Sequence, residues 1–240
     1  MNAPASHFAA TRWTVVAQAK GGDTAAKAAL SELCAAYYAP VVAFLRSRGG
    51  NEDPAREQAH AFFARLLEGG SLGGADPARG RFRSYLLGAV KHFLGDERDR
   101  ANAEKRGGGL EPVPLDALAS DSGLGVSVPV APETELAFDR QWALTIIARA
   151  LEVVAAELRD AGKSAHFDAL KPWLTGECAA LSQADTAGQL GMSEGAVKVA
   201  IHRLRQRFRE AVKAEIAQTV RDAADVDDEL RHLLAVLVAQ

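Results

Sequence analysis

The sequence predicts an all-α protein with two helical domains joined by an extended acidic linker. Apolar residues recur at helical spacing through most of the chain, and pairs of glycines interrupt that pattern at intervals. No segment alternates apolar and polar residues as a half-buried strand does. With 48% hydrophobic and 25% charged residues, the 240-residue chain can build one large or two modest cores.

The N-terminal part predicts helices separated by glycine stops. Thr11 can cap a first helix that ends at residues 21–22, and a second helix begins near Thr24 and continues to about Tyr37. Pro40 is expected to bend or restart the chain, because proline lacks a backbone N–H and clashes with the preceding turn.

Two more helices follow before the composition changes. One begins near Asp53 and ends at Gly69, and the next runs from Arg81 to about Glu104. The glycine- and proline-rich residues 69–80 between them predict a loop.

A linker is predicted where basic residues disappear. Residues 107–134 contain three consecutive glycines, four prolines and several acidic residues, but no Lys or Arg. Helical periodicity resumes at residue 135, which gives predicted domains over residues 8–106 and 135–215. Residues 216–240 form an amphipathic helical tail with an acidic start.

Residues 183–209 predict a helix-turn-helix. A short apolar segment stops at Gly191, and Ser193 can cap a long helix whose Val197, Ile201 and Leu204 share one face. The outward face of that helix is mostly basic, as in a DNA-binding helix that enters the major groove. A helical hairpin that binds protein is the alternative.

Charge and cysteine content narrow the function classes. A net charge of −3 argues against uniform coating of nucleic acid, so DNA contact must come from local basic clusters. Cys34 and Cys178 lack metal-binding spacing, and we expect neither cofactor nor disulfide.

No apolar run approaches the length of a membrane span, so we expect a cytoplasmic protein. An enzyme using a cysteine with a histidine is the weakest reading, since no nucleophile elbow, P-loop or metal spacing is present.

Basic and aromatic residues alternate directly after the predicted loop. Arg81, Phe82, Arg83 and Tyr85 would suit single-stranded nucleic acid, because aromatic rings stack on bases while cations meet phosphates. The alternative is that Phe82 and Tyr85 belong to the core.

Three stretches together resemble the extracytoplasmic-function group of bacterial sigma factors. They read AFFARLLE over residues 61–68, GRFRSYLLGAVKHFLGDERDR over 80–100 and LGMSEGAVKVAIHRLRQRF over 190–208. They occur in the order and at the separations typical of that family, whose members keep the second and fourth sigma domains.

The resemblance implies partners and contact residues. The chain would bind the beta-prime clamp and beta flap of RNA polymerase core and would recognise promoter DNA, while the polymerase performs the chemistry. The core-binding residues would be Asp53, Glu57, His60, Phe63, Arg65 and Glu68. Contacts to the single-stranded −10 element would come from Arg81, Phe82, Arg83, Tyr85, Lys91, His92 and Arg98. Contacts to the −35 element would come from Ser193, Glu194, Lys198, Val199, His202, Arg203 and Arg207.

The sequence departs from the family pattern in two places. His60 and Ala61 stand where most members carry Gln-Glu, so part of the negative charge that meets the polymerase clamp is missing. A Ser/Thr kinase could supply that charge at Ser47 or Ser71, and an anti-sigma factor is another candidate partner. The second departure is Val199-Ala200, which stands where members of the family frequently carry a Ser-Arg pair.

Two alternatives remain open at the level of sequence. The chain could be a stand-alone helix-turn-helix regulator that acts without polymerase. The tail could pack on its own C-terminal domain, or its acidic start could cover the basic recognition face as an autoinhibitory element.

Overall fold

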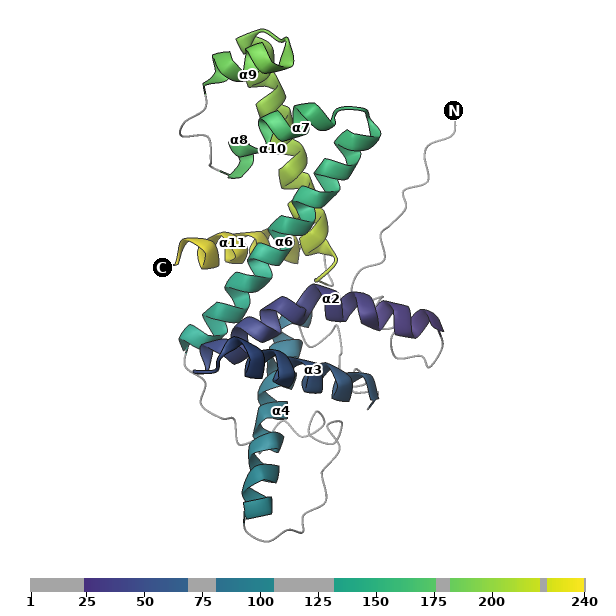
Figure 1. Cartoon of the computed structure of the whole chain (residues 1–240), viewed down its shortest axis with the longest axis vertical. Helices are drawn as coiled ribbons and strands as arrows, with labels where there is room; N and C mark the ends of the chain where they lie inside the picture. Colours follow the sequence, from purple (N-terminus) through teal and green to yellow (C-terminus); the bar gives the residue numbers. More distant parts are fainter. Residues whose placement is uncertain (1–23, 69–80, 106–131, 176–181, 221–223, 240) are drawn as a thin grey trace. The chain divides into compact units, whose positions relative to one another are not determined.

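The computed structural model describes residues 24–68, 81–105, 132–175, 182–220 and 224–239. Every regular element in these residues is an α-helix, which confirms the all-α fold class (Figure 1). The chain divides into two compact units, one of residues 1–145 with 217–240 and the other of residues 146–216. The division falls inside helix α6 (Pro132–Asp160), beyond the predicted linker.

Three helices of the first unit follow one another along the chain. They are α2 (Thr24–Ser47), α3 (Glu52–Glu68) and α4 (Phe82–Lys105), and the last two match the predicted helices closely. Gly49 adopts a φ of +90° in the turn between α2 and α3, a conformation that glycine reaches without steric cost. Aromatic and aliphatic side chains from all three helices form the core, including Tyr37, Phe44, Phe62, Phe82, Leu86 and Phe93.

Helix α2 continues through Pro40, where the sequence predicted a bend or a new start. Proline removes one backbone hydrogen bond from a helix interior. Here Pro40 is buried, and the neighbouring Val41 and Phe44 are fully buried as well. The packing of this apolar face outweighs the lost hydrogen bond, so the prediction of a new helix start at Pro40 was wrong.

Helix α11 (Asp225–Val238) belongs to the first unit. One of the two sequence-based alternatives had placed the tail on the C-terminal domain instead. Its buried residues Glu229, Leu233 and Val236 are spaced as one helical face. A carboxylate that loses water needs charged or hydrogen-bonding partners. Its partners are Arg83 in the first turn of α4 and Arg81 directly before that helix, which explains why α11 lies there.

The second unit contains the helix-turn-helix. The later half of α6 is followed by α7 (Ser164–Leu170), α8 (Pro172–Thr175), α9 (Gln183–Leu190) and α10 (Glu194–Ala217). One apolar cluster joins four of these helices: Val154 and Leu158 from α6, Phe167 and Leu170 from α7, Ala187 from α9, and Val197, Ile201 and Leu204 from α10.

Some predicted features lie outside the described residues. These are the helix capped by Thr11, the loop over residues 69–80, most of the linker, Cys178 and the side chain of Cys34. Residues 132–134, predicted as linker, form the first turn of α6, where the missing N–H of Pro132 costs nothing. None of the described helices is long and apolar enough to cross a membrane.

Candidate nucleic-acid interface

Helix α9 and the turn after it are fixed by caps at both ends. At the start, Ser182 Oγ accepts a hydrogen bond from the Asp185 N–H at 2.9 Å. At the end, Gly191 adopts a φ of +62°, and the Met192 N–H donates to the Ala187 carbonyl at 2.9 Å. This is a Schellman ending, in which glycine takes the left-handed position. The prediction that Gly191 stops the helix is confirmed.

The start of α10 is capped as predicted. Ser193 Oγ accepts a hydrogen bond from the Ala196 N–H at 3.2 Å, which satisfies one of the free donors at the helix start. Val197 and Ile201 then enter the same apolar cluster as Ala187 of α9. The cluster therefore holds both helices of the motif together and leaves the opposite side of α10 in solvent.

Basic residues on the solvent side of α10 form two stripes. Lys198, His202, Arg205 and Arg209, here called the front stripe, are exposed and recur at intervals of three or four residues, so they lie on one side of the helix. Arg203 and Arg207, here called the flank stripe, are also exposed but lie on another side.

The flank stripe borders a groove. Arg203 and Arg207 line it with Glu210 of α10 and with Val153 and Glu157 of α6. The two carboxylates offset part of the positive charge of Arg203 and Arg207, whereas the four residues of the front stripe have one acidic neighbour on the same side of α10, Glu194. A DNA phosphate should therefore be attracted more strongly to the front stripe.

One member of the front stripe also supports the fold. Arg205 donates from Nε and Nη2 to the Trp173 carbonyl at 3.3 and 3.1 Å. This contact ties α8 to α10 and restricts the Arg205 side chain. All residues predicted to contact the −35 element are exposed on α10 or its cap, namely Ser193, Glu194, Lys198, Val199, His202, Arg203 and Arg207.

The segment predicted for single-stranded DNA at the start of α4 is much less accessible. Phe82 is 1% exposed, and its ring meets the Tyr37 ring edge-on with centroids 5.1 Å apart. The core alternative therefore holds for Phe82, which would have to leave the core to stack on a base. Tyr85 is half-buried with its ring centroid 6.0 Å from that of Phe82.

Arg83 is buried between two carboxylates. Its Nε and Nη2 donate to the two carboxylate oxygens of Glu229 at 2.9 and 3.3 Å, and its Nη1 donates to Asp139 Oδ1 at 2.6 Å. The guanidinium also lies 5.3 Å from the centroid of the Trp142 ring. Burial by itself would lower the pKa of Arg83, but Glu229 and Asp139 raise that pKa above its usual value.

Glu229 has a second cationic partner. Arg81 Nε lies 2.6 Å from Glu229 Oε1, and His232 Nε2 lies 3.0 Å from Asp139 Oδ2. Arg81, Arg83, Asp139 and Glu229, here called the buried ion cluster, contain two positive and two negative charges. Removing one partner of a buried pair leaves an uncompensated charge, which costs about 3–5 kcal/mol.

The other residues predicted for the −10 element lie further along α4. Lys91 Nζ donates to Glu135 Oε1 at 2.5 Å, so its charge is also compensated within the first unit. His92 and Arg98 are exposed. The structure thus brings Arg81, Arg83 and Lys91 to internal carboxylates and leaves His92 and Arg98 toward solvent.

The predicted polymerase-binding residues on α3 differ in accessibility. Asp53 and Glu57 are exposed. His60 is exposed too, but its Nε2 lies 2.9 Å from the Tyr38 hydroxyl and the two rings stack with centroids 5.3 Å apart. Asp53, Glu57 and His60 can therefore meet a partner without a change in the core.

The remaining predicted polymerase contacts support the fold. Phe63 is 6% exposed and packs on Phe62, and Arg65 forms a 2.7 Å ion pair with Asp96 of α4. The side chain of Glu68 lies outside the described residues. Phe63 and Arg65 thus stabilise the first unit in this structure.

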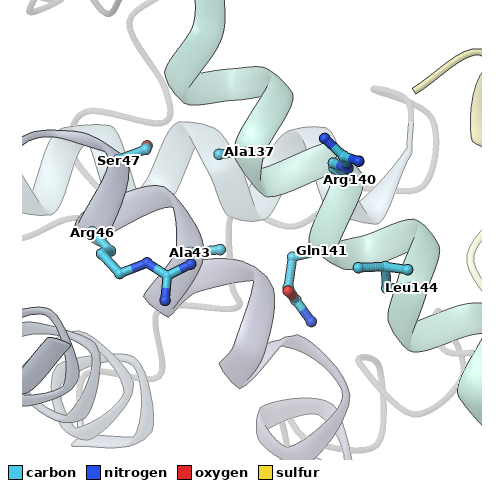
Figure 2. Close-up of a pocket in the computed structure, with 7 residues that line it drawn as sticks. All are labelled: Ala43, Arg46, Ser47, Ala137, Arg140, Gln141 and Leu144. Atoms are coloured by element: carbon cyan, nitrogen blue, oxygen red, sulfur yellow. The ribbon is translucent and has the colours of Figure 1, made fainter. Parts of the chain in front are cut away.

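A shallow trough lies between α2 and α6 in the first unit. Figure 2 shows Arg46 and Ser47 on the α2 side and Arg140 and Gln141 on the α6 side. Its lining contains no carboxylate. Arg46 Nη1 also donates to Glu52 Oε2 at 2.9 Å, and this hydrogen bond holds the pKa of Glu52, which does not line the trough, below its usual value.

Sequence reasoning did not single out Glu229 or Asp139. One signal was available: Glu229 stands one turn before Leu233 on the apolar face of the tail helix. A carboxylate at such a position needs a buried partner, although the sequence does not tell which residue it is. Within the described ranges, no group of three or more His, Cys, Asp or Glu is arranged to hold a metal ion.

Comparison of the chain with protein families, with curated proteins and with solved structures finds no match.

Proposed function

We propose that this chain is a promoter-recognition subunit of bacterial RNA polymerase, similar to sigma factors of the extracytoplasmic-function group. The observation that carries the proposal is the geometry of α10, whose capped start and exposed basic front stripe stand on a packed core. A helix presented in this way fits the major groove, with side chains near its N-terminus reaching base edges.

The residues of α10 divide the work of binding duplex DNA. Lys198 and Arg209 would meet phosphates and fix the orientation of the helix, since cationic side chains supply most of the sequence-independent affinity. His202, Arg203 and the exposed Val199 would contact base edges, where hydrogen bonds and apolar contacts discriminate between base pairs.

A single helix-turn-helix buries too little surface for strong specificity by itself. In the proposal, polymerase core holds the chain through the exposed α3 residues Asp53, Glu57 and His60 and through the beta flap. The basic residues of α4 then contribute the second element of the promoter. The polymerase forms the phosphodiester bonds, and this chain contributes binding and strand separation.

One observation favours a second candidate, a regulator that binds duplex DNA without polymerase. Arg81, Arg83 and Lys91 are paired with internal carboxylates, whereas the basic face of α10 is exposed. A chain of this kind would use α10 alone and would have no need of the α4 cations.

Selection from a pool of random DNA duplexes separates the two candidates. The full chain is incubated with the pool in the presence and in the absence of purified bacterial core polymerase, and retained duplexes are sequenced. The proposed function predicts that a two-element motif is enriched only with core polymerase. Enrichment of one short motif to the same degree without core polymerase would overturn it in favour of the stand-alone regulator.

A further inference from the structure

We propose that α11 is an autoinhibitory element that occupies, with Glu229, the phosphate-binding position of Arg81 and Arg83. This inference deepens the proposed function and rests on it, because it assigns a regulation to the cations predicted to contact single-stranded promoter DNA.

The contact between Glu229 and Arg83 has the geometry of phosphate recognition. Two guanidinium nitrogens of Arg83 donate to the two carboxylate oxygens of Glu229, and Arg81 Nε approaches one of the same oxygens at 2.6 Å. Arginine binds phosphate through the same parallel pair of hydrogen bonds. Glu229 therefore fills the place that a backbone phosphate would take, and the two ligands exclude each other.

The burial of this contact makes the exclusion strong. The Glu229 side chain is 0% exposed and the Arg83 side chain 9% exposed, so a phosphate cannot reach Arg83 while α11 is in place. The local charges are already balanced by Glu229 and Asp139. Arg81 is partly exposed, but its Nε is already paired with Glu229, so a nucleic acid that approaches the closed form competes with that carboxylate.

The helix is nevertheless built so that it can be displaced. Its buried residues are Glu229, Leu233 and Val236, and the half-buried His232 adds one contact to Asp139. Leu234 and Val238 on its other side are 55% and 79% exposed. The departure of Glu229 is costly only while the arginines have no other anion, because the cost comes from an uncompensated buried charge. Phosphates that replace Glu229 would restore the charge balance of Arg81 and Arg83 after α11 leaves.

The first test measures binding of a single-stranded DNA oligonucleotide to the full chain without polymerase. Glu229→Gln should raise the affinity by about tenfold or more, because the arginines lose their internal anion. Asp228→Asn is the matched control: Asp228 pairs with Arg231 at the exposed surface of the same helix, and the affinity should not change. Adding Arg83→Ala to Glu229→Gln should remove the gain.

An unchanged affinity of a folded Glu229→Gln chain, or a gain that survives Arg83→Ala, would overturn the proposal. A second measurement needs no variant. Hydrogen exchange of the unmodified chain with saturating single-stranded DNA should become faster in residues 225–238. Equal or slower exchange there, with the oligonucleotide bound through α4, would also overturn it.

Failure of the proposed function gives a different result. Binding of core polymerase is measured on the same proteins, and a chain that gains affinity for single-stranded DNA but never binds core polymerase contradicts the sigma-factor proposal alone. A chain that binds core polymerase but shows no gain with Glu229→Gln contradicts the autoinhibition alone.

Discussion

Both carboxylate oxygens of Glu229 face nitrogens of Arg83, at 2.9 and 3.3 Å, although 146 positions of sequence separate the two residues. This pairing attaches the last helix of the chain to the first turn of α4. One face of α11 is therefore buried in the first unit, and its Glu229 meets the cations that a −10 contact would need.

Glu229→Gln should lower the free energy of unfolding of the first unit by about 3–5 kcal/mol, because the buried Arg83 and the half-buried Arg81 keep only Asp139 as a counter-charge. Urea denaturation of the full chain measures the change. Asp228→Asn, which removes an exposed pair on the same helix, should cost about 0–1 kcal/mol. Equal costs for the two variants would show that the buried ion cluster does not stabilise the fold.

Ile201→Ala should destabilise the second unit by about 2–5 kcal/mol, because it opens a cavity where α10 meets α9 and α6. Val199→Ala is the matched control, since Val199 is 49% exposed and its truncation should change stability by about 0.5 kcal/mol at most. Thermal unfolding followed by circular dichroism compares them. A small effect of Ile201→Ala would contradict the described packing of the motif.

Ser193→Ala should destabilise α10 by about 1 kcal/mol, because the Ala196 N–H loses its acceptor. Ser193→Asp keeps a capping oxygen and should retain the stability of the unmodified chain. Hydrogen exchange of the backbone amides in the first turn of α10 measures this loss of stability at the helix start. Similar protection in both variants would mean that the cap is not formed in solution.

Lys198→Ala should weaken duplex DNA binding by the polymerase complex and reduce the dependence of log Kd on log salt by about one unit, as expected for one lost phosphate contact. Arg207→Ala should have a smaller effect, because Arg207 borders a groove that also contains Glu157 and Glu210. Fluorescence anisotropy at several salt concentrations measures both variants. A larger loss for Arg207→Ala would place the DNA on the flank stripe instead.

If the chain is a sigma factor as proposed, Ala61→Glu should tighten binding to core polymerase by about 0.2–1 kcal/mol, because it adds a negative charge to the exposed face of α3 that would meet the basic clamp. Ala61 is exposed, so the change should leave the fold intact. Ala61→Gln is the neutral control of similar size. The same affinity for both variants would argue against the missing charge as the reason for any weak binding.

Helix positions could be predicted from the sequence because their signals are local. Glycine stops and apolar periodicity located α3, α4 and α10, and the residues Gly191 and Ser193 have the cap geometry that was predicted for them. The new helix start predicted at Pro40 was wrong because proline is a local signal too, and the packing of Val41 and Phe44 outweighs it.

The accessibility of the candidate site could not be predicted in the same way. Nothing near Arg83 in the sequence reveals that a carboxylate at position 229 will bury it, since pairing over such a distance depends on the tertiary fold. The sequence around Phe82 is likewise compatible with a ring that stacks on a base and with a ring in the core. By contrast, the exposure of Lys198 and His202 follows from the helical period of the buried residues of α10, which are Val197, Ile201 and Leu204 in this region.

Equilibrium binding of the full chain to purified bacterial core RNA polymerase tests the central proposal most directly. The chain is labelled outside α3 and titrated with core enzyme, alongside a variant in which Asp53 and Glu57 are both changed to Lys. The sigma-factor proposal predicts saturable one-to-one binding that the double charge reversal weakens strongly. Absence of binding by the unmodified chain and by Ala61→Glu alike would contradict it.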